Sequence, residues 1–277
     1  RRPAVSTVGF LHPGAMGASI AAACGAADRL WCSEARSAAT FARAEAAGLT
    51  AVTTLDELAE RSDVILAVCP PEAAEDVAAA VRATGFDGIY VDANAVAPET
   101  ARRIGGLFAR FVDAAIVGPP VAGPHSTRLY LAGPDATTVA SMWERSALEA
   151  RVLEGGAGTA SALKVAYAAW TKGSSALLLA VRAYARAEGV DAELITEWAL
   201  SQPGLEQRSE GAARGTAPKA WRFEAEMREI AAALAAVGLP SGFHEAAAEI
   251  DRRLAGFKDR TDIDTASVLT SILDALG

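Results

Sequence analysis

Lys164 is the side chain whose surroundings best suit acid–base chemistry. It lies in the apolar segment Ala162–Ala168, about one and a half turns into a long stretch of helical composition. Burial disfavours the charged form of an amine, so we expect the pKa of Lys164 to fall from about 10.4 toward neutrality. Such an amine can exchange a proton with a substrate hydroxyl at pH 7. The alternative is a lysine that extends its charge into solvent from a domain-bridging helix.

A glycine-containing turn is the second candidate for chemistry. Residues 9–17 read G-F-L-H-P-G-A-M-G and follow the apolar run Val5–Val8. A strand that leads through such a turn into a helix is typical of dinucleotide binding, because glycine admits the pyrophosphate and helical N–H groups bind it. His12 replaces the first glycine of the usual pattern, and a plain strand–turn–helix connection would look similar. The predicted cofactor contacts here are His12, Pro13, Gly14, Ala15 and Met16.

The segment C-S-E-A-R-S, residues 32–37, follows the next predicted strand and bears on the choice of dinucleotide. Serine or arginine at this place accommodates the 2′-phosphate of NADP, whereas an acid accepts the ribose 2′-OH of NAD. Ser33 and Arg36 favour NADP, and Glu34 would favour NAD if it faces the ribose. We predict NADP, with NAD possible, and contacts from all three residues. Cys69 and Pro70, after a later strand, are predicted to line the adenosine side, although prolines also form ordinary loops.

The elements that position these residues follow from the hydrophobic pattern. Continuous apolar runs predict buried parallel strands at Val5–Leu11, Leu30–Cys32, Val64–Cys69, Ile89–Asp92 and Phe111–Val117. Helical segments alternate with them at Ala18–Ala27, Ala38–Ala47, Leu55–Arg61, Glu72–Thr84 and Pro98–Ala109. Two more strands, Thr127–Leu131 and Arg151–Leu153, flank a helix at Thr137–Ala147. This alternation predicts an α/β fold, a Rossmann-type doubly wound parallel sheet.

The second half reads as helix throughout. From Thr159 to about Glu188 there is no proline and one glycine, which predicts a helix of roughly 45 Å. Shorter helices are expected at Ala192–Ser201, Leu205–Ala213, Lys219–Val237 and Phe243–Ala255. We therefore predict a dinucleotide-binding domain at 1–156 and, joined by the long helix, an all-α substrate and dimerisation domain at 157–277.

Composition excludes several classes. The 277 residues carry a formal charge of −8 with no basic tract, which argues against nucleic acid or an anionic membrane as partner. No segment has the pattern of a membrane span or a signal peptide, so a cytoplasmic location is expected. The three cysteines and three histidines lack metal-ligand spacing, so no metal site is expected.

Together these motifs resemble the β-hydroxyacid dehydrogenase superfamily, which includes 3-hydroxyisobutyrate and 6-phosphogluconate dehydrogenases, and within it a bacterial branch. The resemblance covers nearly the whole chain in order. Residues 9–17 resemble its cofactor turn, 91–94 (V-D-A-N) its fifth-strand segment and 113–119 (D-A-A-I-V-G-P) its substrate loop. Residues 158–164 (G-T-A-S-A-L-K) match its G-x-G-x-x-x-K pattern, with Ala160 for the second glycine. The lysine of that pattern is the family's catalytic residue, and it falls on Lys164.

The resemblance also implies a substrate site, from which this chain departs. Residues 117–120, V-G-P-P, lack the hydroxyl of the family's Ser-Gly-Gly, and two prolines remove N–H donors. Binding of a small hydroxyacid should be weakened unless Lys172 or Thr171 holds the anion. The predicted substrate contacts are Asn94, which also lies near the cofactor, with Gly118, Pro119, Tyr167, Thr171 and Lys172.

The resulting expectation is an NAD(P)-dependent oxidoreductase that prefers NADP. It would move a hydride between the cofactor and a small polar hydroxyacid-like alcohol or its carbonyl, with Lys164 as proton donor and acceptor. The resemblance implies a homodimer formed through the helical domain. Imine reductases have a similar fold and generally lack this lysine, so they are the nearest alternative. A non-catalytic NADP-binding sensor, or an interaction module that binds no cofactor, are alternatives from other classes.

Overall fold

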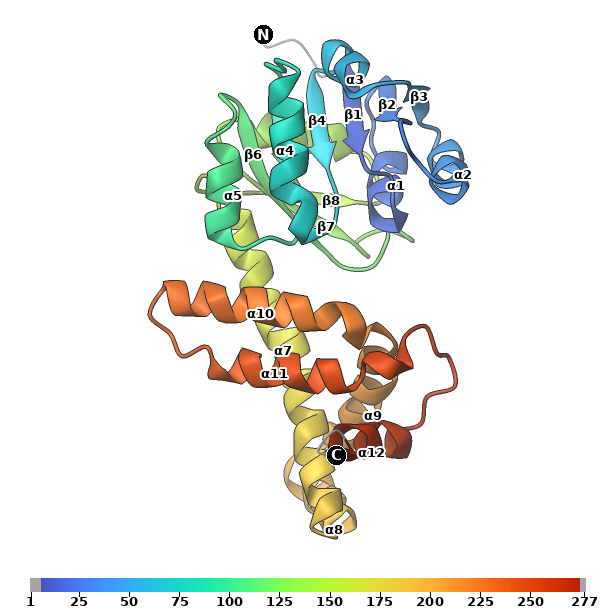
Figure 1. Cartoon of the computed structure of the whole chain (residues 1–277), viewed down its shortest axis with the longest axis vertical. Helices are drawn as coiled ribbons and strands as arrows, with labels where there is room; N and C mark the ends of the chain where they lie inside the picture. Colours follow the sequence, from blue (N-terminus) through green and yellow to red (C-terminus); the bar gives the residue numbers. More distant parts are fainter. Residues whose placement is uncertain (1–5, 275–277) are drawn as a thin grey trace. The chain divides into compact units, whose positions relative to one another are not determined.

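The computed structural model describes residues 6–274, and the chain divides into two compact units, residues 1–164 and 165–277 (Figure 1). The division falls inside one long helix, directly after Lys164. Val5, the predicted start of the first strand, lies outside the described residues. The functional domains expected at 1–156 and 157–277 stay a prediction.

A sheet of eight strands, counted over the described residues, forms the centre of the first unit. Its order is β3-β2-β1-β4-β5-β6-β7-β8. The first six strands are parallel: β1 (Thr7–Leu11), β2 (Asp28–Cys32), β3 (Thr50–Val52), β4 (Val64–Ala67), β5 (Ile89–Asp92) and β6 (Phe111–Val117). β7 (Arg128–Ala132) is antiparallel to β6, and β8 (Glu149–Leu153) is parallel to β7. The chain order reverses between β1 and β4, where open α/β sheets bind ligands beyond their carboxyl ends.

Helices cover both faces of this sheet. One face packs against α1 (Ala15–Ala22), α2 (Ala38–Ala46), α6 (Ala136–Ala140) and the short helix η2 (Ser141–Trp143). The other packs against α3 (Leu55–Arg61), α4 (Ala74–Ala83), which follows η1 (Pro71–Ala73), and α5 (Pro98–Gly105). Within β1, Val8 and Phe10 enter one core and Leu11 enters the other. Burial on both faces explains why the strands read as continuous apolar runs.

The predicted fold class is confirmed, with local differences. The reversed direction of β7 arises because residues 118–127 join it to β6 with no crossover helix. β3 was not expected, since it has three residues and two of them are exposed. The helix expected at Thr137–Ala147 is shorter and forms α6 and η2.

Helices make up the second unit over its described residues. α7 (Thr159–Ala187) enters from the first unit and is followed by α8 (Asp191–Ser201), α9 (Leu205–Thr216), η3 (Ala217–Lys219), α10 (Ala220–Ala236), α11 (Gly242–Arg253), η4 (Ala255–Phe257) and α12 (Thr265–Asp274). α10 and α11 lie side by side in Figure 1, and with α7 they bury Ala176, Met227 and Ala248. α12 was not expected from the sequence. Among residues 6–274, no helix is long and apolar enough to cross a membrane.

Candidate active site

The turn after β1 is open at Gly14 and closely packed at Gly17. The Gly14 N–H donates to His12 O at 2.7 Å, and Gly14 caps α1, which begins at Ala15. A Cβ on Gly14 would meet nothing within 4 Å, so this side of the turn is open. A Cβ on Gly17 would lie 2.7 Å from His12 O, so the close packing of turn and helix requires glycine. Met16, predicted to contact the cofactor, packs against the core of the first face.

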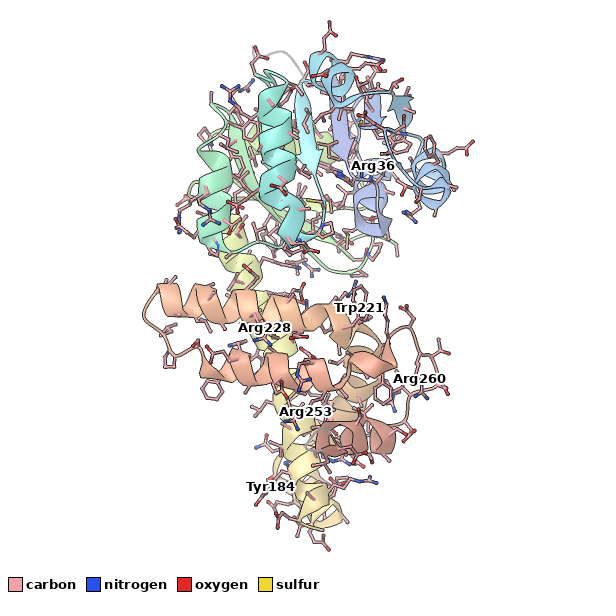
Figure 2. All side chains as sticks on the ribbon, viewed as in Figure 1. Arg36, Tyr184, Trp221, Arg228, Arg253 and Arg260 are labelled. Carbon is pink, nitrogen blue, oxygen red and sulfur yellow. The ribbon has the colours of Figure 1, made fainter. Side chains whose placement is uncertain are left out.

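The loop between β2 and α2 carries Arg36, a cation for which residues 6–274 provide no hydrogen-bond or salt-bridge partner. The side chain of Arg36, which is labelled in Figure 2, is partly buried. Ala35 beside it has a φ of 54°, a conformation rare for residues other than glycine. The Ser33 hydroxyl donates to Val52 O at 2.9 Å, and Glu34 is exposed. Arg36 is thus the residue of this loop best prepared for an anion.

His12 adds an unsatisfied polar atom to the same region. Its Nδ1 is buried and has no hydrogen-bond partner in the described part of the chain. Burial, and secondarily the charge of Arg36, lower the pKa of His12 to about 4. The imidazole is therefore neutral at pH 7.

Asn94 ties together two strand ends at the carboxyl edge. Its Oδ1 accepts the Cys69 N–H at 2.6 Å, and its Nδ2 donates to Asp92 Oδ1 at 2.5 Å. Asn94 is only 3% exposed, so these bonds fix the amide. Burial above all, and also the nearby charge of Asp113, raise the pKa of Asp92 to about 7. Cys69, with Pro70 after it, is thereby held beside the end of β5.

Asp113 and Lys164 join the start of α7 to β6. Asp113 Oδ2 and Oδ1 accept the Ser161 N–H at 3.0 Å and hydroxyl at 2.6 Å. Three residues further along both elements, Lys164 Nζ donates to Ile116 O at 2.8 Å. Burial lowers the pKa of Lys164, which is the direction expected from its apolar neighbours. The amine is therefore held at the end of β6 by one backbone carbonyl.

The loop after β6 is held by contacts with Ser126 and Thr127, just before β7. Gly118 has a φ of 123°, and a Cβ there would lie 2.3 Å from Ser126 O, so only glycine fits. Pro119 O accepts the Thr127 hydroxyl at 2.6 Å. This loop begins at Gly118, two residues after Ile116, whose carbonyl accepts a hydrogen bond from the Lys164 amine.

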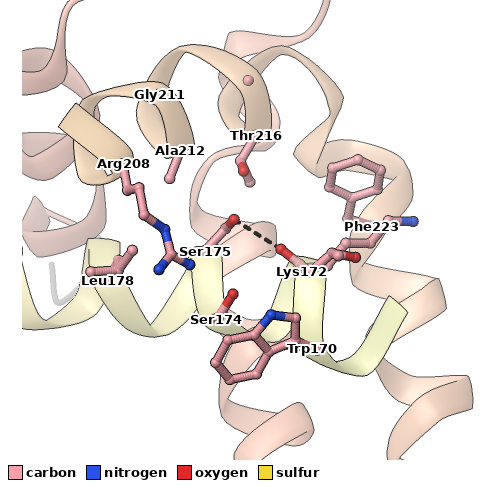
Figure 3. A pocket seen from close by; sticks show the side chains of 12 residues that line it. Trp170, Lys172, Ser174, Ser175, Leu178, Arg208, Gly211, Ala212, Thr216 and Phe223 are labelled. Carbon is pink, nitrogen blue, oxygen red and sulfur yellow. Dashed lines mark hydrogen bonds between the residues drawn. The ribbon is translucent and has the colours of Figure 1, made fainter. Parts of the chain in front are cut away.

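The remaining predicted substrate residues belong to the second unit. Tyr167 is exposed, and its carbonyl accepts the Thr171 hydroxyl at 2.9 Å. Thr171 and Lys172 line a pocket of about 380 Å³ between α7, α9 and α10, shown in Figure 3. Lys172 pairs with Glu226 and lies 4.2 Å from the centre of the Phe223 ring. The Glu226 carboxylate therefore competes with any anion for Lys172, and the contacts of these residues with substrate stay a prediction.

Three residues that position the site were not predicted as part of it: Asp92, Asp113 and Ser161. The available signal was a carboxylate within each of two apolar runs, I-Y-V-D and F-V-D-A-A-I-V. A buried carboxylate needs hydrogen-bond partners, so such a position marks a polar network. Among the described residues no group of three side chains has the arrangement of a metal site.

Comparisons with known proteins agree with this description. Residues 7–96 match a family described as NADP oxidoreductase, coenzyme F420-dependent, and residues 185–254 match a domain of unknown function, DUF1932. An uncharacterised 28.5 kDa protein of Methanothermus fervidus, from the 5′ region of 7S RNA, is 30% identical over 166 residues. This match spans 59% of the chain and 64% of that relative, slightly less than two thirds of its length.

Solved structures share the fold over nearly the whole chain. Mycobacterium tuberculosis 3-hydroxyisobutyrate dehydrogenase with L-serine is 19% identical, with a TM-score of 0.70 over 97% of this chain and 99% of that one. A reductive aminase from Aspergillus terreus, in complex with NADPH and ethyl levulinate, is 20% identical, with a TM-score of 0.53 over 97% and 99%. Together with the family models, this fold confirms the resemblance predicted from the motifs.

Proposed function

We propose that this chain, with the fold of the β-hydroxyacid dehydrogenase superfamily, is an NAD(P)-dependent oxidoreductase that prefers NADP. Its substrate would be a small polar hydroxyacid-like alcohol or the matching carbonyl compound. The observation that carries the proposal is the Lys164 amine, partly buried and bonded to Ile116 O in the same unit as the glycine turn. A lysine held this way is suited to proton transfer.

The residues of the first unit fit a dinucleotide. The open side of Gly14 and the N–H groups at the start of α1 suit a pyrophosphate. Arg36, a cation with no partner in the described residues, suits a 2′-phosphate, and Ser33 lies in the same loop. Cys69 and Pro70 would line the adenosine side, and Asn94 would lie near the nicotinamide. The nicotinamide ring, when bound, gives or accepts the hydride.

Lys164 would manage the proton of the reacting oxygen. In oxidation the neutral Nζ accepts the hydroxyl proton, and in reduction the ammonium returns it. Its lowered pKa increases the share of neutral amine near pH 7. The bond to Ile116 O orients the amine, and Gly118 and Pro119 shape the adjacent loop. Contacts from Tyr167, Thr171 and Lys172 of the second unit are part of the proposal.

Imine reduction is the second candidate. The similarity of fold to the A. terreus reductive aminase favours it, as does a substrate loop with two prolines and no hydroxyl. The presence of Lys164 favours an alcohol or carbonyl substrate instead. A non-catalytic NADP sensor would bind the cofactor and turn over neither class.

We further propose a homodimer formed through the helical unit. On α7, exposed apolar residues recur with the a/d spacing of a heptad: Tyr167, Trp170, Leu177, Val181 and Tyr184, the last labelled in Figure 2. Trp170 is 67% exposed and Tyr184 66%. Ser174 occupies the one position of this spacing between Trp170 and Leu177. Soluble monomers rarely expose an apolar stripe of this kind, and a second copy would offer the same stripe to cover it.

A ligand screen followed by turnover tests the proposed function. We expect NADPH to raise the melting temperature more than NADH does. Panels of hydroxyacids, keto acids and imines with amines then identify the substrate class. Lys164→Ala should lose most of the turnover, while Lys219→Ala, at an exposed lysine, should keep it. Absence of any stabilisation by nicotinamide cofactors would overturn the proposal.

A further inference from the structure

We propose that His12 and Arg36 together bind a phosphate group of the dinucleotide, and that the His12 imidazole takes up a proton when the phosphate binds. This role rests on the proposed function and deepens it. It belongs to this chain in particular, because the usual dinucleotide pattern has glycine where His12 stands.

The His12 backbone is fixed in the turn between β1 and α1. His12 follows the last residue of β1, and its carbonyl accepts the Gly14 N–H at 2.7 Å. Gly17 of α1 packs so closely on the same carbonyl that an added Cβ would lie 2.7 Å away. These two contacts hold the His12 backbone in the turn between β1 and α1. In the proposed complex, a phosphate bound at this turn lies beside the His12 ring.

The ring nitrogen Nδ1 lacks an acceptor or donor of its own. It is buried and has no hydrogen-bond partner among residues 6–274. Buried polar atoms without partners are rare in folded proteins, because their lost hydration is not replaced. A partner supplied by a ligand would remove this cost.

Arg36, on the loop after β2, is a second donor. It is partly buried, forms no hydrogen bond or salt bridge among the described residues, and is close enough to act on His12 through its charge. Its neighbour Ala35 has a positive φ of 54°, a strained conformation of the kind found at binding sites. An imidazole and a guanidinium that share no acceptor match a phosphate, which offers several charged oxygens.

Within residues 6–274, the surrounding elements form no hydrogen bond to His12 Nδ1 and no hydrogen bond or salt bridge to Arg36. Arg43 of α2 donates to Pro13 O at 3.3 Å and to the Thr40 hydroxyl at 3.1 Å. Cys69, after β4, has a thiol whose pKa burial raises to about 12, so it stays neutral. The carboxylates of the neighbouring loops, Glu34 and Glu72, form no hydrogen bond or salt bridge with His12 or Arg36 in the described chain. The missing acceptor is therefore expected from the ligand.

The sign of the proton linkage follows from the charges. In the free protein, burial and the Arg36 charge hold the pKa of His12 near 4, so the neutral ring donates from one nitrogen. A phosphate against Arg36 offsets the repulsion and favours the imidazolium, which donates from both nitrogens. The pKa is then higher in the complex than in the free protein. Binding must tighten as pH falls, by up to about tenfold per unit between the two pKa values.

NMR of the full-length protein with labelled histidine tests this without relying on turnover. The chain has three histidines, so His12→Asn assigns the His12 signal. We expect the free His12 ring to titrate near pH 4 and its midpoint to rise by about two units with saturating NADP⁺. His244→Asn, in the second unit, is the matched control and should leave this shift unchanged.

Dissociation constants for NADPH and NADH between pH 5.5 and 8 give the second readout. The 2′-phosphate has its own pKa near 6, but this contributes equally to wild type and His12→Asn. We expect NADPH affinity to rise about fivefold more in wild type than in His12→Asn as pH falls over this range. If the affinity for NADPH alone depends on pH in this way, His12 contacts the 2′-phosphate. If the affinity for both cofactors does, His12 contacts the pyrophosphate.

The outcomes separate the two proposals. If neither cofactor binds wild type at any pH, the proposed function fails. If NADPH binds and the His12 midpoint stays within about 0.3 unit of its free value, the role of His12 is overturned while the cofactor site stands. If His12→Asn does not fold, the titration of the wild-type ring decides alone.

Discussion

Asp113 accepts two hydrogen bonds from Ser161, from the backbone N–H at 3.0 Å and from the hydroxyl at 2.6 Å. The carboxylate thus lies at the N-terminus of α7, where the helix dipole favours a negative charge. The next contact along both elements, three residues on, is the bond from Lys164 Nζ to Ile116 O. A buried carboxylate therefore sets the position of the amine to which we assign proton transfer.

Ser161→Ala should weaken the contact between Asp113 and the start of α7. Removal of the hydroxyl leaves a buried carboxylate oxygen short of one charge-assisted bond, at a cost of about 1–3 kcal/mol in unfolding free energy. We expect kcat to fall several-fold, while the NADPH dissociation constant stays within twofold, because Lys164 shifts and the cofactor turn does not. Denaturant unfolding and steady-state kinetics measure both. Ser141→Ala, at an exposed serine, is the control, and equal behaviour of the two variants contradicts the positioning role.

The rate should depend on pH through the Lys164 amine. Burial lowers its pKa, so the neutral form appears at a lower pH than for a solvated lysine. Oxidation needs the neutral amine, so its kcat/KM should rise with pH and level off above that pKa. Reduction needs the ammonium and should fall over the same interval. The role is supported if the pH profiles of oxidation and reduction change in opposite directions around one shared midpoint, and if Lys164→Met lacks this midpoint. Profiles unchanged in Lys164→Met contradict it.

Arg36→Ala should change cofactor preference. If Arg36 binds the 2′-phosphate, the loss of its charge weakens NADPH binding by about tenfold or more, since charge-assisted bonds to phosphate are strong. NADH, which lacks that phosphate, should bind within about threefold of wild type. Calorimetry on both cofactors gives the two constants. Arg61→Ala, which removes an exposed arginine paired with Glu57, is the control. An equal loss for both cofactors contradicts the assignment.

Asp92 should make stability depend on pH. Its pKa is about 7 in the folded chain and about 4 when unfolded, so the folded state holds more protons between these values. The stability associated with this proton is present at low pH and is lost as pH rises through about 7. Asp92→Asn keeps an oxygen for the Asn94 bonds and does not titrate. Relative to wild type, it should gain about 2 kcal/mol between pH 5 and 8 in denaturant titrations. A constant difference contradicts this prediction.

A charged residue introduced into the exposed apolar stripe of α7 should prevent dimerisation through the helical unit. Leu177→Glu places a carboxylate among exposed apolar side chains that we expect a second copy to cover. Light scattering should show a dimer for wild type and a monomer for this variant. Leu200→Glu, at a leucine of α8 that is 77% exposed and off the stripe, should leave the dimer intact. A wild-type protein that is monomeric at micromolar concentration contradicts the homodimer.

Much of the fold could be predicted because a strand that is buried on both faces is a continuous apolar run in the sequence. β5 and β6 begin and end where the apolar runs do. The edge strand β3 could not be predicted, because two of its three residues are exposed and it does not form an apolar run. The direction of β7 was also missed, because hydrophobic runs do not encode strand direction.

The candidate site was only partly predictable for a related reason. Apolar neighbours predicted the burial of Lys164, but its acceptor lies 48 residues away, and so does the Asp113 partner of Ser161. Lys172 was predicted to hold an anion, but it pairs with the Glu226 carboxylate. The residues near Lys172 in the sequence do not indicate this pairing. Local pattern predicts which face is buried, whereas the partner of a buried polar group depends on tertiary packing.

A crystal structure with NADP⁺ tests the central claim most directly. We predict the phosphates against the Gly14 turn and Arg36, and the nicotinamide ring next to the Lys164 amine, with Nζ free to reach a substrate oxygen. A nicotinamide ring bound away from Lys164, or phosphates that avoid the turn after β1, would contradict the account.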